Sequence, residues 1–95
     1  MTDRNTMYER LEAVHNFPET YFFKVIGENS QDFVSRVVQA AVNVMGKEQH
    51  LDVSTRASSA GRHVSVTLAA DVEDAETVLD IYEMLQVVQG VRFLV

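Results

Sequence analysis

The spacing of apolar residues along the chain predicts two long amphipathic helices. Asn29 or Ser30 can cap the first helix, because their side-chain oxygens accept hydrogen bonds from the free N–H groups of a first turn. Asp71 or Asp74 can cap the second helix in the same way. The two stripes consist of Phe33, Val34, Val37, Val38, Ala41, Val42 and Met45, and of Ala75, Val78, Leu79, Tyr82 and Leu85.

Strict alternation of apolar and polar residues predicts an antiparallel hairpin between the two helices. Residues 51–58 and 63–70 alternate on either side of a short turn, so each strand is expected to bury one face. Residues 21–26 are rich in aromatic and β-branched side chains and end at Gly27, which predicts a first strand. Residues 91–95 are predicted to form the last strand.

A short helix precedes these elements, because Met7, Leu11 and Val14 fall at helical spacing before Pro18. The order is then β-α-β-β-α-β, which is typical of a ferredoxin-like α+β two-layer sandwich. Right-handed crossovers would place both long helices on one face of a four-stranded antiparallel sheet, with the first and third strands central. We therefore predict one domain over residues 1–95, with residues 1–18 as a helical extension.

A two-layer fold leaves one face of its sheet uncovered, and exposed apolar side chains on such a face usually mark a contact surface. The residues that the alternation places on this predicted interaction face are Phe22, Lys24, Ile26, Arg56, Arg92 and Leu94. The alternative is that the N-terminal helix folds back over the same face.

Charge and composition narrow the possible functions. The chain has 95 residues, no cysteine and a net charge of −6. It therefore cannot form a disulfide, a thiolate metal site or a thiol nucleophile. The acidic balance disfavours nucleic-acid binding, which needs clustered basic residues. Ser65, Thr67 and Ala69 on the third strand also lack the aromatic rings that stack bases in RNA-binding versions of this fold.

The acidic residues gather on the second long helix and just before it. Such a run favours a solvated face, although it would also attract a basic partner. Its members are Asp71, Glu73, Asp74, Glu76, Asp80 and Glu83.

The apolar runs are much shorter than the roughly 20 residues of a membrane span, and the first residues lack a signal-peptide pattern. We therefore expect a cytoplasmic protein.

Catalytic or metal-binding patterns are not evident. His15, His50 and His63 fall in different elements without ligand spacing, so we expect no metal or cofactor. The loop at residues 27–32 holds two acids and no arginine, and it would repel the phosphate group that an acylphosphatase-type hydrolase must bind.

Three segments, residues 11–18, 22–27 and 58–67, resemble the YbeD-like family of small bacterial proteins of unknown function, sometimes labelled lipoate-regulatory proteins. The shared motifs are Phe-Pro before a Lys-Val-x-Gly strand and a Ser-Ser-x-Gly-x-x-x-Ser hairpin. The resemblance implies a fold similar to ACT regulatory domains and no catalytic residue. In ACT-type domains a small ligand lies near the end of the first strand, which corresponds here to Gly27, Glu28 and Asn29.

These observations favour a non-catalytic regulatory or interaction module that binds a protein partner or associates with itself. A small-metabolite sensor of the ACT type is one alternative, and a hydrolase of the acylphosphatase type is the other.

Overall fold

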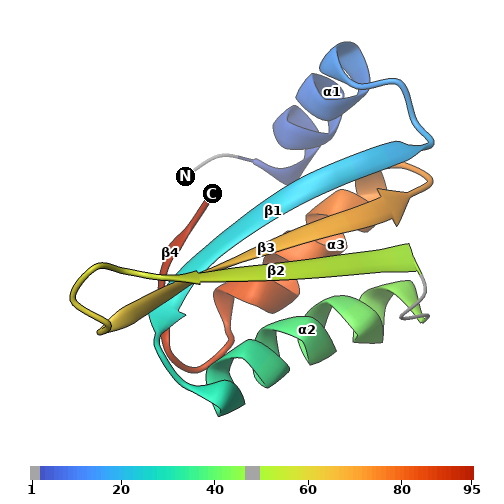
Figure 1. Ribbon diagram of the computed structural model, residues 1–95. Coiled ribbons are helices and arrows are strands. Elements are labelled where there is room, and N and C mark those ends of the chain that lie inside the picture. Colours follow the sequence, from blue (N-terminus) through green and yellow to red (C-terminus); the bar gives the residue numbers. More distant parts are fainter. Residues whose placement is uncertain (1–2, 47–49) are drawn as a thin grey trace.

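The computed structural model describes residues 3–46 and 50–95 (Figure 1). Its helices are α1 (Arg4–Val14), α2 (Gln31–Met45) and α3 (Ala75–Gln86). Its strands are β1 (Glu19–Glu28), β2 (Leu51–Ala57), β3 (His63–Val72) and β4 (Val91–Leu94).

The four strands form one antiparallel sheet in the order β2-β3-β1-β4, and α2 and α3 pack together on one of its faces (Figure 1). This arrangement confirms the predicted ferredoxin-like sandwich, with the first and third strands central. The core lies between the helices and the inner sheet face. Its largest fully buried side chains are Phe23, Phe33, Leu68, Ile81, Leu85, Val25, Val37, Val66, Val72 and Val78.

Each long helix begins at a side-chain cap. The Ser30 hydroxyl oxygen accepts a hydrogen bond from the Phe33 N–H at 3.0 Å. The Asp74 carboxylate accepts from the backbone N–H and the hydroxyl of Thr77, at 2.8 and 2.7 Å. Of the two candidates that the sequence offered for each helix, Ser30 and Asp74 are therefore the caps.

The Asp74 cap makes stability depend on pH. The hydrogen bonds from Thr77 hold the pKa of the Asp74 carboxyl below its ordinary value. A carboxyl whose pKa is lowered by folding stabilises the fold above its unfolded pKa, and this contribution is lost as the pH falls through the folded value. Replacing Asp74 by alanine should therefore cost about 1 kcal/mol at neutral pH and less in acid. Chemical denaturation from neutral pH to about pH 3 measures the difference.

The neighbouring Glu73→Ala variant is the control, because Glu73 is exposed and lies outside α3. A cost of Asp74→Ala that stays constant down to acid pH would contradict the capping argument.

Strand β2 differs from the expectation that each hairpin strand buries one face. In β3 every second residue is buried, whereas in β2 only Leu51 is even half-buried. Val53, which shares the inner side with Leu51, is 41% exposed. The helices lie over β1, β3 and β4, so the inner face of β2 extends past their edge. The prediction is wrong for β2.

Strand β4 contains an irregularity that shifts its alternation. Val25 pairs with Leu94 and Ile26 pairs with Phe93, but Gly27 pairs with Val91. The extra residue, Arg92, lies at the register shift, as in a β-bulge. Leu94 therefore packs against the core, and its predicted outward position is wrong. Phe93 takes that position instead and is 66% exposed.

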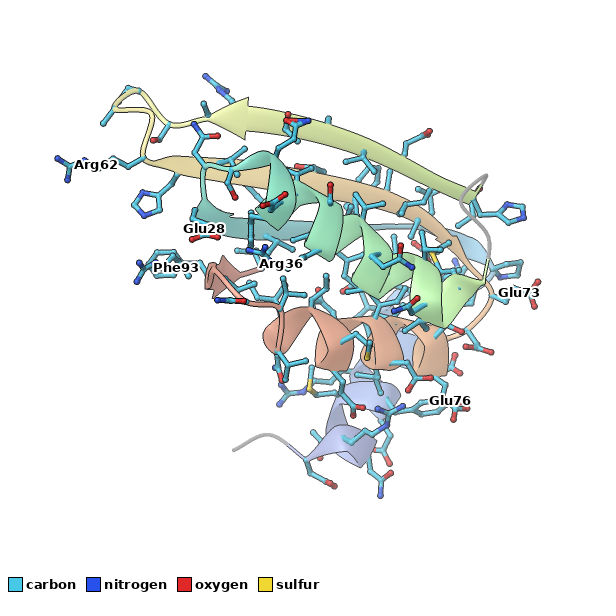
Figure 2. All side chains as sticks on the ribbon, turned by 90° about the horizontal axis from the view of Figure 1, so that it is seen from below. Glu28, Arg36, Arg62, Glu73, Glu76 and Phe93 are labelled. Atoms are coloured by element: carbon cyan, nitrogen blue, oxygen red, sulfur yellow. The ribbon has the colours of Figure 1, made fainter. Side chains whose placement is uncertain are left out.

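Helix α1 packs beside α3 and leaves the open sheet face uncovered (Figures 1 and 2). Arg4 pairs with Asp80 at 2.7 Å and also with Glu83. Leu11 packs against the core, whereas Val14 is 75% exposed. The alternative in which this helix folds over the open face therefore does not occur. Asp80 and Glu83, two acids of the predicted solvated helix face, remain partly exposed to solvent while they pair with Arg4 of α1.

Candidate functional site

The uncovered face of the sheet is the candidate functional site, and the strand register fixes which side chains meet there. Residues directly opposite each other in antiparallel strands lie on the same face. Lys24 and Val95 form such a pair through two backbone hydrogen bonds of 3.2 and 2.8 Å. The rows across the face are Arg56–Ser65–Ile26–Phe93, Ser54–Thr67–Lys24–Val95 and Asp52–Ala69–Phe22.

The half of this face formed by β1 and β4 is apolar. Phe22, Phe93 and Val95 are 65%, 66% and 67% exposed, and Ile26 is half-buried between them. Lys24 lies at the centre of this group and is exposed. Figure 2 shows Phe93 projecting from β4 away from α2 and α3. We call these five residues the open-face patch. Large exposed apolar side chains gathered in this way are typical of a contact surface.

The half formed by β2 and β3 is mostly polar. Arg56 is exposed near the hairpin end of this half, where a recess of about 380 Å³ opens. The residues around the recess are Ile26, Arg56, Ala57, Ser58, Ser59, His63, Val64 and Ser65. The face therefore combines an apolar surface with a recess whose lining includes hydroxyl, imidazole and guanidinium groups.

The predicted interaction residues divide into three groups. Phe22, Lys24 and Ile26 lie together on the open face of β1, and Arg56 lies two strands away in the same row as Ile26. Arg92 is exposed at the register shift. Leu94 points toward the core, as described above.

Sequence reasoning missed Phe93 and Val95 as members of the face. Four of the five residues at 91–95 are apolar, so their alternation fits either orientation of the strand. Only the position of the extra residue decides between the two orientations.

The three residues of the predicted ligand site, Gly27, Glu28 and Asn29, contact other parts of the chain. A Cβ atom on Gly27 would lie 2.3 Å from Cζ of Phe33. The Glu28 carboxylate accepts a hydrogen bond from Arg36 at 2.8 Å (Figure 2). The Asn29 amide donates to the carbonyl of residue 61 at 2.9 Å. These contacts describe a close-packed strand-to-helix junction, and a ligand there stays a prediction.

Another recess, of about 590 Å³, opens between α1, α3 and the end of β4. Its lining includes Met7, Leu79, Tyr82 and Leu94. Burial raises the pKa of Tyr82, and so does the contact of its hydroxyl with that of Tyr21 at 3.2 Å. Tyr82 also packs edge-on against the buried Phe23 ring. Its raised pKa is therefore explained by its packing in the aromatic cluster.

The histidines have different surroundings. Nδ1 of His15 is 3.2 Å from the Glu19 carboxylate, His50 borders a recess beside Asp71, and His63 borders the hairpin recess. Over residues 3–46 and 50–95, no three histidine or carboxylate side chains come together as a metal site would require. No helix in the same ranges is long and apolar enough to cross a membrane.

Comparison with known proteins identifies relatives across most of the chain. A family model described as "Protein of unknown function (DUF493)" matches residues 12–95. A UPF0250 protein of Shewanella piezotolerans is 32% identical over 83 residues, which cover 87% of this chain and 92% of the relative. A UPF0250 protein of Shewanella halifaxensis is 28% identical with the same coverage. These matches confirm the family resemblance drawn from the sequence motifs.

Proposed function

The chain belongs to the DUF493 family, whose function is unknown, and we propose that it is a non-catalytic regulatory module of the cytoplasm that acts by binding a protein. The observation that carries the proposal is the open-face patch. It places two phenylalanines and a valine, each about two-thirds exposed, on the face of the sheet opposite α2 and α3, which none of the described helices covers. Keeping such side chains in water is unfavourable, and a partner surface would remove that cost.

The chemistry of the patch defines its partner. Aromatic side chains on rigid backbone lose little conformational freedom when they bind, and they often dominate the energy of an interface. Lys24 lies among the apolar residues, and no ion pair involves it within the described residues. The complementary surface would therefore present apolar side chains around a carboxylate. Its acidic group would pair with Lys24 inside a ring of contacts that exclude water.

Binding by the patch can be tested with a double variant, Phe22→Ser with Phe93→Ser. The wild-type chain and the variant are immobilised separately, incubated with a native lysate of the source cells, and the retained proteins are quantified by mass spectrometry. Loss of two aromatic contacts should reduce the retention of a specific partner at least about tenfold. Both residues are exposed, so the variant should unfold at nearly the wild-type denaturant concentration.

A second double variant, Val14→Ser with Val87→Ser, is the matched control. These valines are 75% and 79% exposed, and they lie on α1 and at the end of α3, away from the open face. The control should retain the same partner as the wild type. Equal retention by all three proteins, or retention by none above the bare resin, would contradict the proposal.

A further inference from the structure

Strand β2 presents a sheet edge with which no other strand of residues 3–46 and 50–95 pairs, and this edge is separate from the open-face patch. It is the outer strand next to β3, and its pairing with β3 runs without interruption from Leu51 to Ala57. Natural edge strands are usually protected by proline, lysine, a bulge or a covering segment. Residues 51–57 contain no proline or lysine and no bulge, and six of the seven are exposed.

The direction of the backbone groups along this edge follows from one hydrogen bond. The N–H of Ser58, just after β2, donates to the carbonyl of His63 at 2.8 Å, so the backbone groups of Ser58 point toward β3. This direction alternates along a strand. The residues of β2 whose backbone N–H and C=O groups point to the free edge are Leu51, Val53, Thr55 and Ala57.

The charges of β2 are arranged symmetrically. Asp52 and Arg56 are the only charged residues of the strand, and each lies two positions from Ser54. Neither forms an ion pair with any other described residue. Asp52, Ser54 and Arg56 lie opposite Ala69, Thr67 and Ser65 of β3, so all three side chains are on the open face of the sheet.

We infer that β2 pairs with the β2 strand of a second copy of this chain, in antiparallel orientation with the two Ser54 residues opposite each other. Asp52 of each copy then lies opposite Arg56 of the other. These are non-hydrogen-bonded pairs, in which opposing side chains approach most closely. The result is a symmetric dimer with a continuous sheet, and the inference does not depend on the proposed function of the open-face patch.

The other side of the strand is complementary in the same register. Val53 lies opposite Thr55 of the second copy, a pair of β-branched residues of the kind that packs well across strands. Leu51 lies opposite Ala57, so the large residue of each pair meets a small one. Shifting the symmetry axis to Val53 or to Thr55 keeps the side chains on their faces but separates Asp52 from Arg56. Only the register centred on Ser54 pairs all seven residues and both charges.

A charge exchange tests this register. The Arg56→Asp variant places two pairs of carboxylates opposite each other, and the Asp52→Arg variant places two pairs of guanidinium groups opposite each other. Each variant alone should associate at least about tenfold more weakly than the wild type, measured by analytical ultracentrifugation at physiological ionic strength. Mixing the two variants should restore the dimer, because every opposing pair then carries opposite charges. Restoration by mixing also shows that both variants are folded.

A single cysteine locates the symmetry axis. The chain has no cysteine, so Ser54→Cys introduces one thiol, which in the dimer faces its own copy at a distance suited to a disulfide. Mild oxidation should link this variant into covalent dimers much faster than Ser59→Cys, which lies in the exposed hairpin turn. A wild-type chain that sediments as a monomer at all concentrations would overturn the inference. So would a mixture of the two charge variants that remains monomeric, or equal linking at positions 54 and 59.

Discussion

Replacing Phe23 by alanine is expected to lower the free energy of unfolding by about 4 kcal/mol. The side chain is 0% exposed. Its ring centre lies 4.9 Å from those of both Tyr21 and Tyr82, so it joins β1 to α3 within an aromatic cluster. Truncation removes the buried ring and leaves a cavity that this cluster cannot readily fill. Urea denaturation followed by circular dichroism measures the loss.

The residue before it provides a matched control. Phe22 is the same side chain on the same strand, but it faces outward and is 65% exposed. Its replacement by alanine should change stability by no more than about 0.5 kcal/mol. The milder Phe23→Leu variant should cost about 1.5 kcal/mol, which keeps the comparison measurable if Phe23→Ala does not fold. Similar losses for Phe22→Ala and Phe23→Ala would show that the two faces of β1 are wrongly assigned.

The second large effect is expected from Gly27→Ala, at about 3 kcal/mol. A Cβ at this position would lie 2.3 Å from Cζ of Phe33 and 2.5 Å from the carbonyl oxygen of Gly90. Both distances are far below van der Waals contact, and one obstacle is backbone. The strand, the helix and the loop before β4 would have to move apart. Thermal and urea denaturation of the variant measure the cost.

Two further variants separate steric clash from backbone strain. Gly61 has a φ angle of +75°, and no atom lies within 4 Å of the place that a Cβ would take there, so Gly61→Ala should cost only about 1 kcal/mol. Gly27→Ala should cost less in a Phe33→Leu background than in the wild type, because leucine is shorter than the ring that blocks the new methyl group. The contact with the Gly90 carbonyl would remain. A Gly27→Ala variant as stable as the wild type would contradict the close packing of this junction.

The elements that were predicted correctly from the sequence are those in which one side is buried in the core, because burial makes apolar residues recur at regular spacing. Helices α2 and α3 and strand β3 each bury one side in the core. The apolar stripe or alternation of each element therefore shows which side faces the core. The order of the elements then leaves one simple topology, and the sheet has it. The same reasoning placed Phe22, Lys24 and Ile26 on the open face.

The features that were missed depend on neighbours that the local pattern does not contain. The alternation in β2 looks like that of β3, but burial also requires a helix above the strand, and beyond Leu51 every residue of β2 is exposed. In β4 a single extra residue reverses the orientation of Phe93 and Leu94 without changing the composition. For α1, the stripe of Met7 and Leu11 could cover either sheet face or helix. In the structure α1 packs beside α3, where Leu11 contacts the core and Arg4 pairs with Asp80 and Glu83.

The central position of β1 has a consequence for how the chain folds. Its partners, β3 and β4, both follow it only after long intervening segments. The β2–β3 hairpin can close locally, whereas β1 must wait for distant sequence and lose the entropy of closing large loops. During synthesis, β1 leaves the ribosome before either of its partners. Its apolar side chains therefore remain exposed until β3 has been synthesised. During this interval a chaperone could bind the unpaired strand.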